Sequence, residues 1–365
     1  MSDEVYRQLG ETMAKRRLGG RSLDIPEYDE MLRVLFTPEE AEIQNAMPAG
    51  RFTPDVIAKE TGRDEEKVTA ILETMADKGL CMSFVRGGTR FYVGPPLMPG
   101  IFEYQFMRGT KTDRDREIAR AIHNYRTASV GAARAPARVA YPGSRVIPVD
   151  RTIKAEAAVQ TYDQILDYIE KSDPIAVTTC YCRHEALLVD ESDVCGMPME
   201  VCMQFRTTAE YVIERGIGRR VSKEEAIDIM RQAEEAGLVH ACVNMQRLDF
   251  ICNCCPCHCA ILTGILRQPR PAEAVLHSFE PSFGSEPCTL CGICVDRCPA
   301  KALTLGTADL PEWDEDRCIG CGVCASGCPE EVITLVERAG IFTPPIDRNA
   351  LGEAVVRARA QGVSS

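Results

Sequence analysis

The stretch Cys288-Thr-Leu-Cys291-Gly-Ile-Cys294-Val-Asp-Arg-Cys298-Pro299 decides the C-terminal fold of this 365-residue chain. A second run with the same spacing, from Cys318 to Pro329, follows thirty residues later. The repeat extends beyond the cysteines, because Ala302-Leu-Thr-Leu305 matches Val332-Ile-Thr-Leu335. Self-similarity of this kind predicts two copies of one small unit, each of which contributes a strand.

Both runs have the spacing Cys-x2-Cys-x2-Cys-x3-Cys-Pro, and over about residues 280–338 the chain resembles the two-cluster bacterial ferredoxins. The resemblance implies a βαβ repeat with two [4Fe–4S] clusters that pass single electrons between partner proteins. In this arrangement three cysteines of a run bind one cluster and the fourth binds the other. The expected ligand sets are Cys288, Cys291, Cys294 and Cys328 for the first cluster, and Cys318, Cys321, Cys324 and Cys298 for the second.

Glycines lie between these cysteines, at Gly292, Gly320, Gly322 and Gly327. A residue without Cβ lets backbone N–H groups approach the sulfurs, and such hydrogen bonds tune a cluster's potential. The alternative is a pair of structural zinc sites, which also use Cys-x2-Cys pairs. Zinc sites usually separate two such pairs by a long loop, so the spacing favours clusters.

The cysteine content sets the expected environment of the chain. Nineteen cysteines follow metal-ligand spacings instead of the framework of a short secreted domain, which predicts a reducing, cytoplasmic setting. The N-terminus mixes acidic and basic residues, and nowhere do about 18 apolar residues run together, so we expect neither a signal peptide nor a membrane span. The net charge of −12 argues against nucleic acid as a partner.

A second set of cysteines lies in the centre of the chain. It begins with Cys180-Tyr-Cys182-Arg-His184, continues with Cys195 and Cys202, and ends with Cys252-Asn-Cys-Cys-Pro-Cys-His-Cys259. Exposed thiolates oxidise, so this density predicts a bound group. One or two further Fe–S clusters, zinc, and thiols without metal are the three alternatives. The expected ligands of one further cluster are Cys182, Cys195 and Cys202. The fourth ligand is one of Cys254, Cys255 and Cys257, and Cys255 is the choice here.

These central motifs carry a second resemblance. Cys180-Tyr-Cys-Arg-His184, Gly237-Leu-Val-His240 and Ile251-Cys-Asn-Cys-Cys255 ahead of a ferredoxin repeat resemble multidomain 4Fe–4S dicluster proteins of anaerobic bacteria. His258 stands where a further cysteine would make an unbroken run, so its role as a ligand is open. A histidine ligand raises a cluster's potential, as it does in Rieske centres.

The N-terminal part, residues 1–95, resembles a winged helix-turn-helix. Helices are predicted after Pro54 and after Asp64, and two strands surround Gly87-Gly88. A helix that reads DNA needs basic and amide side chains toward the groove. Acidic residues outnumber the basic ones on the second helix, which favours a protein-docking unit over a DNA-binding one: Glu65, Glu66, Glu73 and Asp77 against Lys67 and Lys78.

The remaining boundaries follow from composition. Residues 96–150 are rich in proline, alanine and arginine and predict a linker or wrapping arm with a helix near Asp113 to Arg126. A cysteine-rich α/β domain is expected over 151–279, the ferredoxin module over 280–338 and a tail helix over 339–365. The fold class is thus α+β and multidomain. Charge is unevenly distributed along the chain: the net charge of residues 108–154 is +7 and that of residues 280–340 is −7.

Three functions are compatible with these features. The first is an electron-transfer protein or redox-complex subunit, in which the C-terminal clusters exchange electrons with the central cysteine-rich site or a partner enzyme of unspecified identity. The second is an oxidoreductase whose central domain binds substrate at a cluster. The third is a redox-sensing transcriptional regulator that uses the winged helix on DNA. Electron transfer requires nothing beyond the motifs and is the favoured interpretation.

Overall fold

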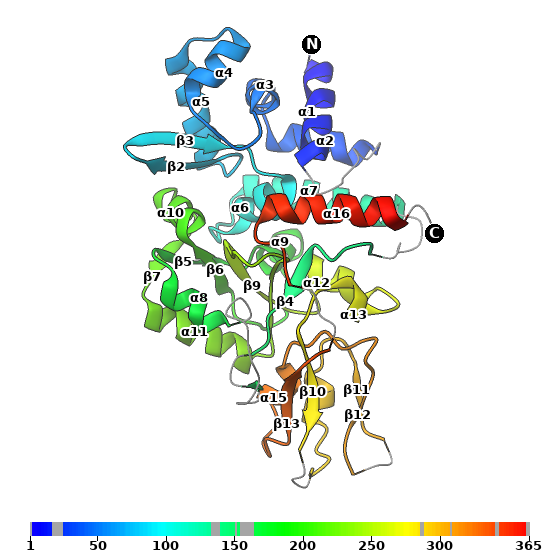
Figure 1. Ribbon diagram of the computed structural model, residues 1–365. Coiled ribbons are helices and arrows are strands. Elements are labelled where there is room, and N and C mark those ends of the chain that lie inside the picture. Colours follow the sequence, from blue (N-terminus) through cyan, green and yellow to red (C-terminus); the bar gives the residue numbers. More distant parts are fainter. Residues whose placement is uncertain are drawn as a thin grey trace. The chain divides into compact units, whose positions relative to one another are not determined.

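The computed structural model describes residues 2–16, 25–132, 139–149, 152–153, 164–284, 288–306, 309–339 and 343–362. Two compact units make up the chain, and each combines several parts of the sequence (Figure 1). Unit 1 contains residues 1–135, 181–194 and 207–219, and unit 2 contains residues 136–180, 195–206 and 220–365. Both units mix helices with small sheets, so the predicted α+β class is confirmed.

Unit 1 begins with three helices, α1 (Ser2–Arg16), α2 (Pro26–Leu35) and α3 (Pro38–Ala46). Helix α1 packs against the other two. Helix α3 starts with a capping box: the Thr37 hydroxyl accepts a hydrogen bond from the Glu40 N–H, and the Glu40 carboxylate accepts one from the Thr37 N–H. This satisfies two backbone donors at the helix start.

The next part of unit 1 contains the helices and the hairpin that the sequence predicts. Helices α4 (Pro54–Thr61) and α5 (Glu65–Asp77) precede a three-stranded sheet of β1 (Arg51–Phe52), β3 (Thr89–Val93) and β2 (Met82–Arg86), in that order. Gly62 ends α4 in the left-handed conformation, with φ of 65°. The Asp64 carboxylate caps α5 by accepting from the Lys67 N–H.

The predicted arm contributes to the core of unit 1. After the turn η1 (Leu97–Ile101) come α6 (Phe102–Phe106) and α7 (Asp113–Ala132), and α7 packs against α2, α6 and the later helix α9 (Tyr181–Val189). The Tyr125 ring on α7 lies 5.3 Å from the Tyr28 ring and 6.1 Å from the Phe102 ring, centroid to centroid. Residues 133–138 and 150 of the arm lie outside the described residues.

Helix α10 (Arg206–Glu214) covers the hairpin and the end of α5 within unit 1. Arg86 and Arg90 on the hairpin form ion pairs with Glu210 and Glu214, at 2.7 and 2.6 Å. The Tyr211 hydroxyl donates a hydrogen bond to the Ala76 carbonyl of α5 at 2.8 Å. The C-terminal half of α5 is therefore held against α10.

Unit 2 contains a six-stranded sheet with the strand order β4 (Ser144–Val146), β8 (Val239–Val243), β9 (Phe250–Cys254), β6 (Glu200–Phe205), β5 (Ile175–Thr179) and β7 (Arg219–Val221). The pairs β4–β8, β8–β9, β9–β6 and β6–β5 are antiparallel. Strand β5 lies between β6 and β7 in this order. Its first four residues are buried, as expected for a central strand.

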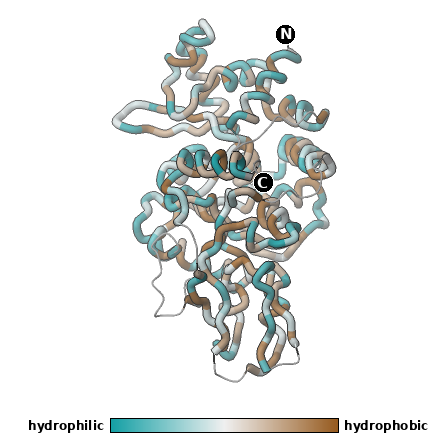
Figure 2. The backbone as a smooth tube through the Cα atoms, turned by 45° about the vertical axis from the view of Figure 1, so that its right-hand side comes forward, coloured by the Kyte–Doolittle hydropathy of each residue, from teal (hydrophilic) through white to brown (hydrophobic). Residues whose placement is uncertain are grey.

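Unit 2 also contains helices. They are α8 (Ile165–Lys171), α11 (Lys223–Glu235), α12 (Ala260–Leu266), α13 (Pro271–Ala274) and α16 (Arg348–Gly362). Helix α11 packs on β5 and β6, and the Ser222 hydroxyl caps it by accepting from the Glu225 N–H. Figure 2 shows hydrophilic and hydrophobic residues alternating along the helices, as expected where one face is buried. On the tail helix α16, Leu351 and Val355 are buried whereas Val356 is exposed.

The C-terminal module of unit 2 contains two small sheets and two short helices. Strand β10 (Phe279–Phe283) pairs with β13 (Ile333–Glu337), and β11 (Leu303–Thr304) pairs with β12 (Glu312–Trp313), both antiparallel. Helices α14 (Ile293–Arg297) and α15 (Val323–Ser326) contact each other. The two repeated segments at 302–305 and 332–335 each overlap a strand. Among the described residues, no helix is long and apolar enough to cross a membrane.

Candidate cluster and metal sites

Each cysteine run of the C-terminal module bends around a short helix that starts at a glycine. Gly292 begins α14 with φ of 79°, and Gly322 begins α15 with φ of 77°. Gly320 also has a positive φ, 63°, whereas Gly327 does not. The left-handed conformation is accessible to glycine without steric cost, so three of the four glycines make these turns feasible.

The four thiols expected around the first cluster line one hollow. Cys288, Cys291, Cys294 and Cys328 lie on its wall. Cys328 comes from the second run. The structure thus places the fourth cysteine of one run beside three cysteines of the other, as the resemblance implies. Four thiols around one space are the donor set that a [4Fe–4S] cluster requires.

The other four thiols line a second hollow. Its wall contains Cys298 of the first run together with Cys318, Cys321 and Cys324 of the second. The structure thus brings together both predicted groups of four, and the donor set again suits a cluster. The ligand assignments themselves stay predictions.

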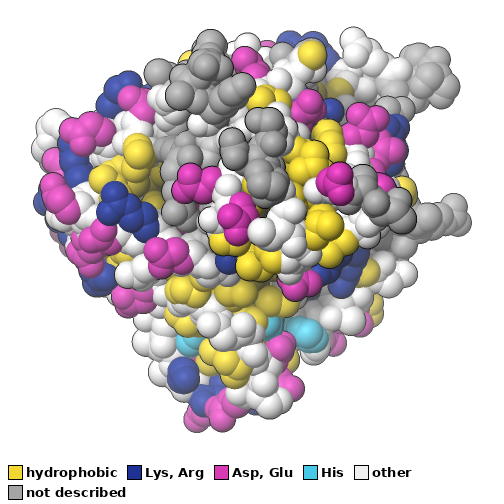
Figure 3. Space-filling view, turned by 90° about the horizontal axis from the view of Figure 1, so that it is seen from below, with side chains coloured by type: hydrophobic (Ala, Val, Ile, Leu, Met, Phe, Trp, Pro, Cys, Tyr) yellow, Lys and Arg dark blue, Asp and Glu magenta, His cyan; other side chains and the backbone are white. Residues whose placement is uncertain are grey.

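The two hollows differ in their exposure to solvent. Cys291 is exposed, and the apolar side chains of Leu290, Ile293 and Leu305 on the wall of the first hollow are 40, 39 and 46% exposed. By contrast, Cys298 and Cys321 on the second hollow are buried. Figure 3 shows the protein from below, where apolar side chains gather between acidic and basic ones. The first hollow therefore contains an exposed thiol, Cys291, besides the buried Cys294, whereas the thiols of the second are buried or half-buried.

Backbone N–H groups point at sulfurs in both hollows. The Leu290 N–H donates to Cys288 Sγ at 3.4 Å, and the Ala302 N–H donates to Cys298 Sγ at 3.2 Å. Burial raises the pKa of Cys318 to about 11 and that of Cys324 to about 12. Without a bound cation these thiols hold their protons, so cluster assembly has to release protons.

In the central sheet, strand register brings four further thiols together. Strands β6 and β9 pair Met203 with Ile251, so the same register sets Cys202 opposite Cys252. Cys254 is two residues beyond Cys252 and faces the same side of the sheet. Cys259 at the start of α12 donates from its thiol to Cys254 Sγ at 3.1 Å.

This thiol row, defined as Cys202, Cys252, Cys254 and Cys259, is a coupled set. Hydrogen bonds from Cys202 and Cys254 lower the pKa of Cys252 to about 7. Hydrogen bonds to Cys252 and Cys259, together with burial, raise the pKa of Cys254 well above its usual value. Of Cys252 and Cys254, Cys252 is thus the thiol that ionises first.

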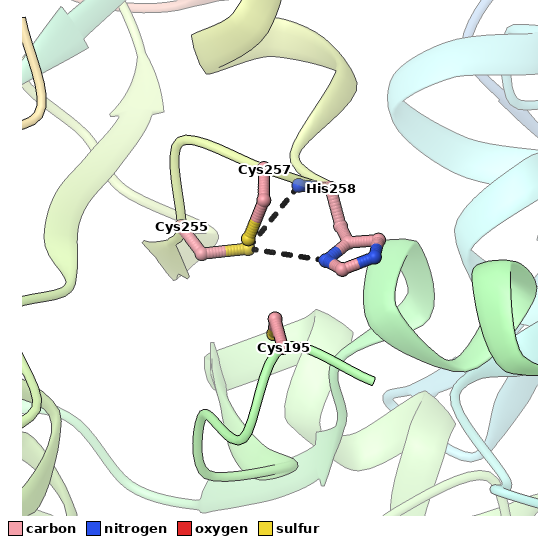
Figure 4. A group of neighbouring side chains, drawn as sticks. All are labelled: Cys195, Cys255, Cys257 and His258. Atoms are coloured by element: carbon pink, nitrogen blue, oxygen red, sulfur yellow. Dashed lines mark hydrogen bonds between the residues drawn. The ribbon is translucent and has the colours of Figure 1, made fainter. Parts of the chain in front are cut away.

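A separate, compact group consists of Cys195, Cys255, Cys257 and His258. Their ligand atoms all lie within 4.8 Å of one another. Figure 4 shows Cys255, Cys257 and His258 on one turn, with Cys195 facing them from another loop. The His258 N–H donates to Cys255 Sγ at 3.4 Å, and the His258 Nδ1 lies 4.0 Å from the same sulfur. Three thiols and an imidazole have the donor set and spacing to hold a metal ion.

The structure groups the four predicted ligands of a further central cluster differently. Cys195 and Cys255 lie together in the compact group, while Cys202 belongs to the thiol row. Cys182 lies on α9, which belongs to unit 1. Sequence spacing did not single out Cys257, and it left His258 open. The signal for both was the tight Cys-Pro-Cys-His turn at 255–258.

The histidines of the central motifs have structural partners. The His240 Nδ1 lies 2.6 Å from the Asn253 Oδ1, which links the motif at 237–240 to the motif at 251–255. The His184 Nε2 lies 2.7 Å from the Thr110 carbonyl within unit 1. The buried His277 lies 2.7 Å from the Arg338 guanidinium, and burial and this cation lower its pKa to about 4.

Comparison with known families identifies the C-terminal module. Residues 282–304 match a family model described as a 4Fe-4S binding domain, and residues 310–333 match a second model with the same description. The two matches contain both cysteine runs. None of the curated proteins and none of the solved structures matches the chain. The chain is thus an iron–sulfur cluster-binding protein with two C-terminal 4Fe–4S motifs.

Proposed function

We propose that the protein transfers single electrons through two C-terminal [4Fe–4S] clusters, either as an independent carrier or as a subunit of a redox complex. Its electrons go to the central cysteine-rich site or to a partner enzyme. The observation that carries this proposal is the pair of hollows, each lined by four thiols and joined by the exchanged cysteines Cys298 and Cys328. Clusters held this way lie next to each other, and their chemistry is one-electron transfer.

The exposure of the first hollow supports a direction for this transfer. A partner protein exchanges electrons at the cluster held by Cys288, Cys291, Cys294 and Cys328, since Cys291 lies at the surface. The second cluster, beside the buried Cys298 and Cys321, passes electrons inward. The reducing, cytoplasmic setting expected from the sequence suits thiolate-ligated clusters.

The N-terminal part of unit 1 is proposed to be a winged-helix-like unit that does not bind DNA. Its helix order and three-stranded sheet are compatible with that fold. Glu73 and Asp77 on the candidate recognition helix α5 are paired with Arg215, and α10 covers the end of the helix. A helix that is covered and acidic offers little to a DNA groove. The domain limits 1–95, 96–150, 151–279, 280–338 and 339–365 stay predictions.

The decisive experiment measures iron and acid-labile sulfide per chain after anaerobic purification, with EPR of the reduced protein. Two clusters require about eight iron atoms and eight sulfides. Cys291→Ala is expected to lower the iron content and to change the EPR signal of one cluster. Cys81→Ala is the control, because Cys81 is a buried thiol of unit 1 and belongs to neither cysteine run. Unchanged iron in Cys291→Ala would contradict the proposal.

A further inference from the structure

We propose that Cys195, Cys255, Cys257 and His258 bind a single tetrahedral divalent ion of the zinc class, and that this ion fastens the loop around Cys195 to the turn after β9. The ion is separate from the C-terminal clusters. The proposal does not rest on electron transfer, since a closed zinc site has a structural role whatever the clusters do.

The spacing of the ligand atoms indicates one ion. Around tetrahedral zinc, with Zn–S bonds of about 2.3 Å, two sulfurs lie about 3.8 Å apart. The four ligand atoms of this group all lie within 4.8 Å of one another, so a small inward shift completes the coordination. In a cubane each thiolate binds a different iron, and the separation of the irons adds to the separation of the sulfurs.

The C-terminal module provides an internal comparison for this argument. There four thiols line each of two hollows. Among the residues that the structure describes, the C-terminal thiols form no group as compact as the one at Cys195. The chain thus contains two kinds of thiol group. The C-terminal thiols line hollows, whereas the ligand atoms of the group at Cys195 lie close to one another.

The type and number of donors point to zinc in a structural role. Thiolate and imidazole donors in a tetrahedral set suit zinc, and the combination of three cysteines and one histidine is one of its usual closed sites. Four protein ligands leave no position for water or substrate. The His258 N–H that donates to Cys255 Sγ supports the thiolate form, as outer hydrogen bonds do at metal sites.

The location of the ligands shows what the ion would hold in place. Residues 191–199 contain neither helix nor strand, and Cys195 lies in this segment just ahead of β6. The other three ligands lie on the turn between β9 and α12. Cys195 and Cys255 are sixty residues apart, so one ion would close a long loop and contribute directly to folding.

The binding step balances without any redox partner. Zn²⁺ and three thiols give a Zn(S)₃N complex and three protons, while the imidazole binds in its neutral form. Cys257 is exposed and Cys195 is half-buried, so the ion can enter from solvent. Bare thiols at this position would be open to oxidation.

The test is metal analysis of the full chain by plasma mass spectrometry, with iron and zinc counted in the same sample. We expect one zinc per chain besides the iron of the C-terminal clusters. Cys257→Ser should lose zinc, keep its iron and melt several degrees lower. Cys242→Ser, a cysteine of β8 outside the group, should keep zinc. His258→Cys should retain zinc, because four thiolates also form a closed site.

Cobalt provides a readout that does not depend on stability. Co²⁺ in place of zinc should give the visible absorption of a tetrahedral thiolate site, and the bands should shift in His258→Cys. The proposal is overturned if the purified wild type contains no zinc, if Cys257→Ser retains it, or if Cys257→Ser loses about four iron atoms, since the group would then hold a cluster. Missing iron with normal zinc would instead contradict the proposed electron transfer.

Discussion

At the scale of single residues, two glycines with the same backbone conformation face different surroundings. Gly292 and Gly320 both have positive φ, at 79° and 63°. A Cβ at Gly292 would lie 3.6 Å from the nearest atom, on Leu305, which is an ordinary contact. A Cβ at Gly320 would collide with the Phe279 carbonyl and lie 2.7 Å from the His277 Nδ1.

Gly320→Ala is therefore expected to damage the second cluster more than Gly292→Ala damages the first. Both changes add about 1–2 kcal/mol of left-handed strain, and only Gly320→Ala adds a collision with backbone. Melting temperature and iron per chain measure the difference. Equal losses in the two variants would show that strain alone matters at these turns.

At the scale of elements, Arg215, directly after α10, links the hairpin to α5. The side chain of Arg215 is 6% exposed and lies 3.0 Å from the Glu73 carboxylate and 2.9 Å from that of Asp77. Its guanidinium also donates to the Ser83 hydroxyl at 2.6 Å. A buried cation with three acceptors stabilises the contact because no water replaces them easily.

Arg215→Ala is expected to destabilise unit 1 by about 2–3 kcal/mol, since the charged hydrogen bonds to Glu73, Asp77 and the buried Ser83 hydroxyl are lost. Arg220→Ala is the matched control: this arginine pairs with Asp173, but the two side chains are 63 and 78% exposed. Exposed pairs contribute about 0–1 kcal/mol. Thermal unfolding of both variants tests the contrast, and a smaller loss for Arg215→Ala than for Arg220→Ala would contradict it.

At the scale of the whole molecule, charge is unevenly distributed along the chain. The segment 280–340 has eleven acidic and four basic residues, a balance of −7 within a net −12. Exposed apolar side chains on the first hollow lie within this acidic segment. An exposed apolar surface within a negatively charged segment favours a redox partner with a positively charged surface.

Electron transfer from the reduced protein to a small basic haem protein should slow as salt increases. Raising the ionic strength from 0.05 to 0.5 M should reduce the second-order rate constant about tenfold or more, because salt screens the attraction that steers association. A neutral small-molecule acceptor is the control and should show little change. Stopped-flow spectroscopy measures both rates, and a rate with the basic partner that rises with salt would contradict the expected polarity.

The sequence by itself determined the C-terminal module, because the cysteines that bind a cluster there are only two or three residues apart along the chain. Three cysteines two residues apart and a fourth before proline lie within a dozen residues, so local geometry alone restricts what they can bind. The helices after Pro54 and Asp64 and the strands around Gly87-Gly88 were equally local and are present. The family matches at 282–304 and 310–333 agree with this module.

Only the tertiary structure decided how the central cysteines group. Strand register sets Cys202 against Cys252, and the turn after β9 brings Cys257 and His258 to Cys195, sixty residues earlier. Such pairings depend on sheet order and loop paths, which spacing along the chain does not encode. The reason is physical: local patterns fix ligands that share a turn, whereas ligands from separate strands and loops meet only after the sheet has formed.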